Sequence, residues 1–189
     1  MVNNSKMINK KMKELGYTNS WITLGIIDLD TIESQYSALS NSSSFPEHYR
    51  VEVLNRYLDQ RTSFTDEELK LLIDTFRDDQ DLASTLYLHL LQERKLNKKQ
   101  FDFVAEFFGD LGQWAEDKLR LIRLKRSLLE NELSKKELIK IIDKQNSKEQ
   151  HLILDSPDIN IDILRYMAEN SKFSKIVNKA QNRSKRSDQ

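Results

Sequence analysis

Phe64-Thr65-Asp66-Glu67-Glu68-Leu69 has the pattern of a helix start. Thr65 can cap the helix, Glu68 stands three residues later where it can bond back to the cap, and Phe64 and Leu69 have the spacing of a hydrophobic staple. The pattern recurs as Leu-Asn-Lys-Lys-Gln-Phe at 96–101, Leu-Ser-Lys-Lys-Glu-Leu at 133–138 and, degenerately, Ile-Asn-Ile-Asp-Ile-Leu at 159–164. Helices are therefore predicted to begin at four related points.

The four starts are far enough apart for a helical hairpin each. Their cap residues are 32, 37 and 26 residues apart, and apolar residues follow each start in helical register. Second helices are expected around residues 82–90, 111–129, 151–154 and 176–177. Repetition of this kind predicts a helical repeat array with an irregular period, and it indicates a fold rather than a function.

Composition agrees with an all-α protein. The 189 residues are 38% hydrophobic and 32% charged, with 4 Gly and 2 Pro, which suits helices with apolar stripes and charged outer faces. Lys+Arg and Asp+Glu are both 30, so no global charge attracts nucleic acid or an anionic membrane. The absence of Cys excludes disulfides, thiolate metal sites and a cysteine nucleophile.

The same features predict a cytoplasmic protein with no membrane partner. The N-terminal residues are basic but no apolar region follows them, and no stretch approaches the length of a membrane span. The abundance of Lys, Asn and Ile suggests an AT-rich coding genome, as in some bacteria and phages.

Residues 1–44 are predicted to form an atypical N-terminal helical cap region. Residues 5–15 have helical periodicity before Gly16, a C-cap residue. Residues 21–29 are apolar and partly β-branched, so they fit a strand or a buried helix, and we favour helix or irregular packing because no strand partner exists. A capping box is expected at Asp30 and Glu33, and a polar loop at residues 40–44. Pro46 is expected to open a helix at its first position.

Residues 149–170, Glu-Gln-His-Leu-Ile-Leu-Asp-Ser-Pro-Asp-Ile-Asn-Ile-Asp-Ile-Leu-Arg-Tyr-Met-Ala-Glu-Asn, resemble the variant leucine-rich or HEAT-like bacterial helical repeats. Those units alternate a helix, a short Ser-Pro-Asx turn and a Leu-x-x-Leu/Met-Ala helix. The resemblance is confined to this C-terminal part of the chain, and the longer helix at 111–129 departs from it. It implies a binding scaffold and supplies no catalytic residues.

The helix expected at 111–129 has two apolar stripes, as a helix with two packing partners should. Trp114 lies on one stripe and is expected to pack in the core. The remaining arc is basic, and so is the end of the chain, where residues 181–189 are predicted to be a disordered tail. These cations are either a solvated surface or contacts for an acidic protein or phosphates. The candidate partner-binding residues are Arg120, Arg123, Lys125, Arg126, Lys179, Arg183, Lys185 and Arg186.

No motif indicates catalysis or a bound cofactor or metal. Asp74, Asp78, Asp79 and Asp81 lack the Gly and terminal Glu of a calcium loop, so Asp79 or Asp81 is expected to cap the following helix. His89 and Glu93 have i, i+4 spacing, which could align a base with a carboxylate, but such pairs are common in charged helices. A hydrolase or lyase site at His89 is therefore a third interpretation.

The sequence thus predicts an all-α protein of stacked antiparallel helical hairpins over residues 45–180, a HEAT-like solenoid or an irregular array. Its expected function is non-enzymatic: stoichiometric binding of another protein, as an inhibitor, immunity or adaptor protein does. The alternative is nucleic-acid binding by the basic helix face and the tail, which would make binding depend on salt.

Overall fold

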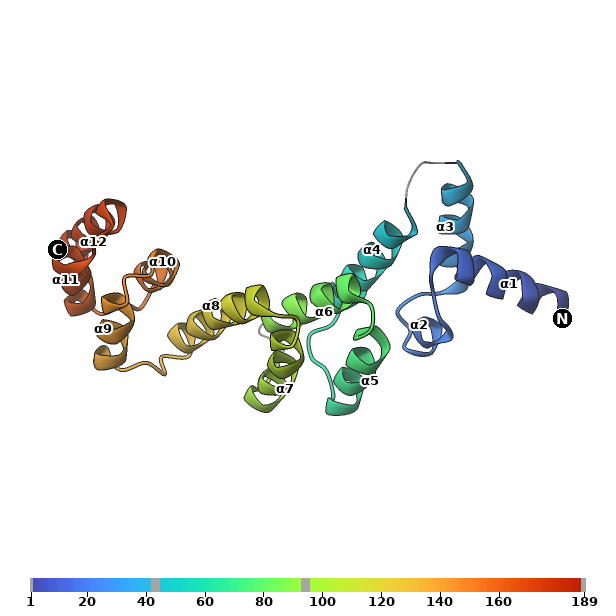
Figure 1. Ribbon diagram of the computed structural model, residues 1–189, viewed down its shortest axis with the longest axis horizontal. Helices are drawn as coiled ribbons and strands as arrows, with labels where there is room; N and C mark the ends of the chain where they lie inside the picture. The colour runs from blue at the N-terminus through green and yellow to red at the C-terminus, as the bar shows by residue number, and fades with distance from the viewer. Residues whose placement is uncertain (1, 42–44, 93–95, 188–189) are drawn as a thin grey trace. The chain divides into compact units, whose positions relative to one another are not determined.

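A computed structural model describes residues 2–41, 45–92 and 96–187, and all regular structure in these ranges is α-helical, as predicted (Figure 1). The chain divides into two compact units, Met1–Gly112 and Gln113–Gln189. The first contains α1 (Val2–Leu15), α2 (Asn19–Thr23), α3 (Leu29–Asn41), α4 (Pro46–Asp59), α5 (Asp66–Phe76), α6 (Gln80–Gln92) and α7 (Lys98–Gly109). The second contains α8 (Gln113–Leu129), α9 (Lys135–Asp143), α10 (Ser147–Asp155), α11 (Ile161–Asn170) and α12 (Ser174–Ser187).

The repeated helix starts are confirmed at the level of single hydrogen bonds. Thr65, Asn97 and Ser134 each form a complete capping box with the residue three positions later. The Asn160 side chain accepts a hydrogen bond from the backbone N–H of Asp162 at 2.8 Å. Because the Ser134 hydroxyl and backbone N–H both donate to Glu137, they hold the pKa of its carboxyl below the usual value.

In each unit the helices that follow these starts are joined by an ion pair between neighbouring N-termini. Lys99 Nζ of α7 lies 3.0 Å from Asp66 Oδ2 of α5, and Lys135 Nζ of α9 lies 2.7 Å from Asp162 Oδ2 of α11. In both cases a residue in the first turn of one helix pairs with its counterpart 33 or 27 residues away. The first helices of consecutive hairpins therefore lie side by side, and the structure is an array of packed helices.

In Met1–Gly112, Trp21 of α2 joins the N-terminal region to α5. Its buried ring makes edge contacts with Tyr17 and Phe76, with centroids 4.8 and 4.9 Å apart. Residues 19–23 are helical, as favoured from the sequence, but α3 begins earlier than expected because Asp28 accepts the hydrogen bond of the Thr31 N–H at 2.7 Å. The prediction that Asp30 caps this helix is therefore wrong, and the cap is Asp28.

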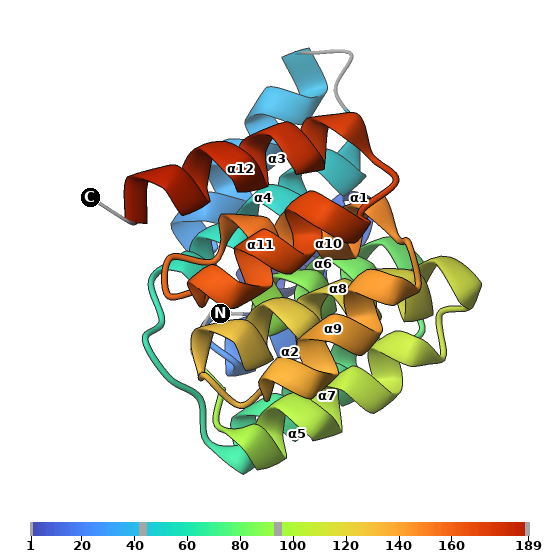
Figure 2. The same ribbon diagram turned by 90° about the vertical axis from the view of Figure 1, so that its left-hand side faces the viewer.

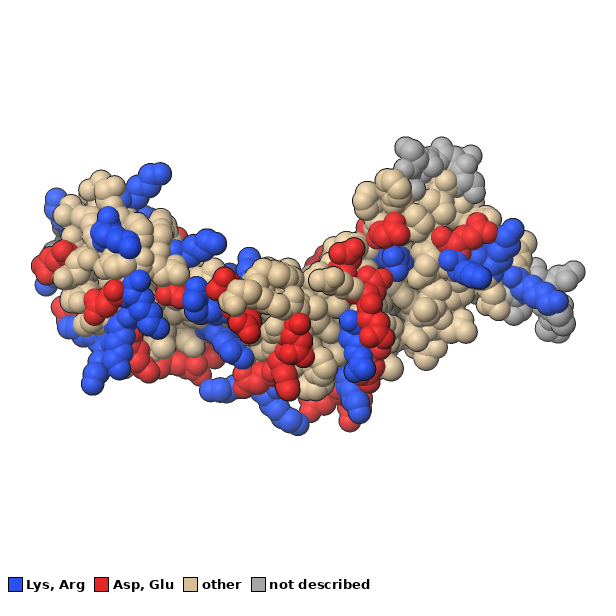
Figure 3. Space-filling view, viewed as in Figure 1, with Lys and Arg blue, Asp and Glu red and all other residues tan. Residues whose placement is uncertain are grey.

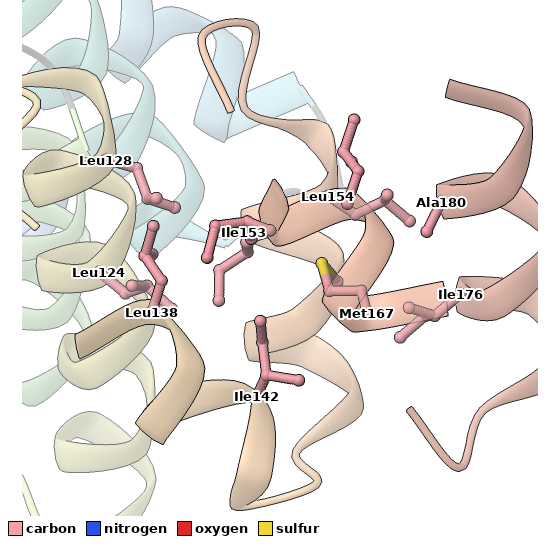
Figure 4. Close-up of a cluster of buried hydrophobic side chains, with 11 residues drawn as sticks. Leu124, Leu128, Leu138, Ile142, Ile153, Leu154, Met167, Ile176 and Ala180 are labelled. Atoms are coloured by element: carbon pink, nitrogen blue, oxygen red, sulfur yellow. The ribbon is translucent and has the colours of Figure 1, made fainter. Parts of the chain in front are cut away.

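In Gln113–Gln189, α8, α10 and α12 enclose one apolar core together with α9 and α11 (Figures 2 and 4). Helix α10 contacts α8, α9 and α12, and α11 packs against both α9 and α12. The buried members of this core are Leu124, Leu128, Leu138, Ile142, Ile153, Leu154, Ile163, Leu164, Met167, Ile176 and Ala180.

Two boundaries differ from those expected. We expected a boundary after residue 44, at the end of the N-terminal cap region, but the two compact units meet at residue 112. Helix α1 packs against both α3 and α4, so residues on the two sides of position 44 belong to the same unit. We also expected residues 181–189 to form a disordered tail. This prediction is wrong for residues 181–187, because α12 continues to Ser187. Its last turn contains Lys185 and Arg186, whose charges favour a helix C-terminus.

Two further points concern the ends of elements. Pro46 begins α4, as predicted, and Gly16 follows α1 with a φ of +75°. In the loop expected at 40–44, α3 reaches Asn41, and residues 42–44 lie outside the described ranges.

Among the helices of the described chain, none has both the length and the apolar character needed to cross a membrane.

Candidate partner-binding groove

The predicted cations of α8 do not form one surface. Arg120 Nε lies 2.9 Å from Glu149 Oε1 of α10, so its charge is engaged between two helices. Arg126 Nε pairs with Glu130 at 2.9 Å, four residues along the same helix. Arg123 and Lys125 are exposed to solvent. These four side chains therefore do not form a continuous phosphate-binding face along α8.

Two of the four predicted C-terminal cations have structural contacts with α10. The Arg183 guanidinium donates to the carbonyl oxygens of Leu154 and Ser156, the latter at 3.1 Å, and so caps the end of α10. Lys179 Nζ pairs with Asp155 in the last turn of the same helix. Lys185 and Arg186 are exposed on the last turn of α12.

Trp114 is the main correction to the predicted site. The core packing expected for it is wrong, since 48% of its surface is exposed. On its stripe Leu124 and Leu128 are buried, but Leu121 is only half-buried. Leu124 and Leu128 belong to the apolar core that α8 shares with the other helices of the unit, whereas Trp114 and Leu121 border an open groove.

The groove lies within Gln113–Gln189, between the first turns of α8 and the turn that joins α9 to α10. Its volume is about 700 Å³. Residues spaced three, four and seven apart on α8 form one wall, and the turn forms the other. The lining residues are Trp114, Asp117, Lys118, Arg120, Leu121, Gln145, Asn146, Ser147 and Lys148.

The turn wall is held by two short-range features. Gln145 has a φ of +53°, the left-handed conformation that ends a helix, and reverses the chain after α9. Asn146 then caps α10, since its Oδ1 accepts from the backbone N–H groups of Lys148 and Glu149 at 3.0 and 3.2 Å. The position of Lys148 at the groove follows from these two turns.

A buried polar network fixes the same wall from behind. Gln150 is fully buried, donates to the Ile142 carbonyl at 2.8 Å and accepts from the Ser171 hydroxyl at 2.6 Å. Gln145 accepts from the Lys172 N–H at 3.0 Å and donates to the Asn170 carbonyl at 3.1 Å. The Gln150 bonds are shielded from solvent and the Gln145 bonds are exposed, and together they tie the turn wall to the segment between α11 and α12.

The groove is positively charged and belongs to the positive unit. Three cations, Lys118, Arg120 and Lys148, and one anion, Asp117, line it. Gln113–Gln189 contains 17 Lys and Arg against 12 Asp and Glu, a formal charge of +5, and Met1–Gly112 balances it with −5. On the visible face of Gln113–Gln189 the two signs are interspersed (Figure 3).

The other candidate residues have structural contacts. His89 Nε2 lies 3.5 Å from Asp59 Oδ1, and Glu93 lies outside the described residues. Asp79 caps α6 by accepting from the Leu82 N–H at 3.2 Å and pairs with Arg50 at 2.9 Å, which confirms the capping interpretation. The described residues contain no group of three or more His, Asp or Glu side chains placed to hold a metal ion.

Arg120 is the one groove residue among the candidate partner-binding residues predicted from the sequence. Lys118 and Lys148 lie in separate helices whose contact is not visible from sequence spacing. No protein-family model, curated protein or solved structure matches the chain.

Proposed function

We propose that the protein is a binding module that forms a stoichiometric complex with a partner protein, as an inhibitor, immunity or adaptor protein does, without catalysis. The observation that supports this best is Trp114, a large aromatic side chain 48% exposed at the edge of a groove. Tryptophan is enriched among the few residues that supply most of the energy of protein interfaces.

The setting of Trp114 favours binding for a second reason. The facing wall is fixed by the Gln150 network, so little conformational freedom has to be lost when a partner binds. A HEAT-like scaffold remains our proposal for the array as a whole, and it agrees with a binding role because such arrays present broad surfaces to partners.

The experiment is capture of partners by the tagged chain, followed by reconstitution. Nuclease-treated extract of the native host is passed over the wild-type chain, Trp114→Ala and Phe45→Ala. The last is a matched control, because Phe45 is an even more exposed aromatic in the other unit. Partners identified by mass spectrometry are purified and titrated with the chain.

We expect one protein that forms a complex of defined stoichiometry with the wild type and with Phe45→Ala, and at least tenfold weaker binding by Trp114→Ala. Equal binding by all three variants would exclude the groove. A reconstituted partner that is chemically altered by the chain would exclude a purely binding role.

The second candidate is nucleic-acid binding, which the +5 charge of Gln113–Gln189 favours together with an exposed Trp that can stack on a base. The pairing of Arg126, Lys179 and Arg183 with protein groups counts against it. If the protein binds nucleic acid, captured partners must be lost after nuclease treatment. The logarithm of its affinity for nucleic acid must also fall linearly with the logarithm of the salt concentration.

A further inference from the structure

Resting on the proposed function, we infer that the groove takes an acidic segment of the partner protein. A carboxylate of that segment binds among Lys118, Arg120 and Lys148, and a neighbouring aliphatic or aromatic side chain packs on Trp114 and Leu121. The inference specifies the chemistry of the partner, which the proposed function leaves open.

The groove lining supports both halves of this assignment. Its cations outnumber its anions three to one, so an acidic segment is attracted where a basic one is repelled. Trp114 and Leu121 stand seven residues apart on one face of α8 and give the same wall an apolar surface. A segment with only acids would leave that apolar surface exposed, and a segment with only apolar residues would leave the excess positive charge of the groove unneutralised.

Arg120 is prepared to accept a carboxylate. Glu149, whose side chain is only 7% exposed, binds Nε at 2.9 Å and fixes the guanidinium at the groove. Nη2 lies 3.6 Å from Asp117 Oδ1, which is too long for a hydrogen bond. A guanidinium has five donors in a rigid fork, so a carboxylate of the partner can bind the Nη edge while Glu149 keeps its own bond.

The N-terminus of α10 is not the anion-binding element. Asn146 already accepts from the N–H groups of Lys148 and Glu149, so the donors that usually hold an anion at a helix start are occupied. Recognition therefore falls to the three cationic side chains.

A carboxylate fits the groove better than a phosphate backbone. Nucleic acid needs cations that follow successive phosphates, and here Asp117 interrupts the cationic wall while Lys179 and Arg183 are engaged with α10. A single carboxylate needs only the local cluster.

The test is nuclear magnetic resonance of the 189-residue chain labelled with 15N, whose two Trp residues give two indole N–H signals. Trp21 is buried in one unit and serves as the internal reference, and Trp114 lies at the groove of the other. Probes are synthetic peptides in which two Asp or Glu flank a Leu or Phe at different spacings. Matched peptides have Asn or Gln in place of the acids, and an oligothymidylate is the nucleic-acid probe.

We expect acidic peptides to shift the Trp114 signal and not the Trp21 signal, with at least tenfold weaker binding of the amide peptides because a charge-assisted hydrogen bond is lost. The double variant Lys118→Glu/Lys148→Glu should abolish the shift. Arg123→Glu/Lys125→Glu, which changes two exposed cations of α8 outside the groove lining, is the matched control and should retain it.

Four results would overturn the inference: no shift of the Trp114 signal with any acidic peptide, equal binding of acidic and amide peptides, binding of the oligothymidylate alone, or a shift that depends on protein concentration without any probe. The last result would identify a second copy of the chain as the occupant.

Failure of the proposed function would give a different set of results. If Trp114→Ala loses the captured partner but Lys118→Glu/Lys148→Glu keeps it, the function stands and the acidic chemistry is wrong. If Trp114→Ala keeps the partner, the groove is excluded and the inference fails with it, and if no protein forms a stoichiometric complex with the wild type, the function itself is wrong.

Discussion

Removal of Arg120 should destabilise Gln113–Gln189, because Glu149 would be left as a buried charge without its partner. Loss of one partner costs about 3–5 kcal/mol in a fully buried ion pair and about 0–1 kcal/mol in an exposed one. Glu149 is 7% exposed but Arg120 is 56% exposed, so the pair lies between these limits. We expect Arg120→Ala to lower the free energy of unfolding by about 2 kcal/mol.

A second substitution separates the buried charge from lost packing. In Arg120→Ala/Glu149→Gln the buried group is neutral, and about 1 kcal/mol of the loss should return. The assay is urea unfolding followed at the two indole signals, since Trp21 and Trp114 belong to different units and report each one separately. A loss below about 0.5 kcal/mol, or no recovery in the double variant, would refute the assignment of Glu149 as a charge that depends on Arg120.

Three further outcomes are expected. Leu69→Asp should unfold Met1–Gly112, because this side chain is fully buried. Leu71→Asp, on the exposed side of the same helix, should leave the circular dichroism unchanged. A folded Leu69→Asp variant would contradict the predicted helical array. Gly16→Ala should lower the free energy of unfolding by about 1–2 kcal/mol, measured with urea, since φ is +75° and the added methyl group would lie 3.2 Å from another side chain. Gly109→Ala is the control and should leave this free energy unchanged, because nothing lies within 4 Å of the added group. Equal effects of the two substitutions would be inconsistent with strain at Gly16. The lowered pKa of Glu137 stabilises the folded state at pH values above the pKa of the unfolded chain, and this contribution is lost as the pH falls through the folded pKa. Glu137→Gln should therefore be less stable than wild type at pH 7, and the difference should shrink as the pH is lowered; a difference independent of pH would contradict the cap.

The helix starts were predictable because their chemistry is local. The bonds between Thr65 and Glu68 join residues three positions apart, so the pattern is complete within one stretch of sequence. Asp28 shows the limit: Asp28 and Asp30 both offer a cap in the sequence, and the structure uses Asp28.

The groove was not predictable because its parts are joined by long-range packing. An apolar stripe predicts that Trp114 is buried, but only the packing of the folded unit determines that Leu124 and Leu128 enter the core while Trp114 stays 48% exposed. Similarly, the basic residue Arg183 looks like part of a solvated tail until its bonds to the end of α10, 27 and 29 residues away, are known. Charge and hydrophobicity of single helices do not contain this information.

The zero net charge is misleading as a guide to partners, since it is the sum of −5 on Met1–Gly112 and +5 on Gln113–Gln189. Charges act on a partner over about 8 Å at physiological ionic strength, so an approaching acidic segment responds to the unit it meets and not to the whole chain. It is attracted by Gln113–Gln189 and repelled by Met1–Gly112, which restricts productive encounters to the unit that contains the groove. Such steering acts mainly on the association rate, so salt should slow complex formation more than it speeds dissociation.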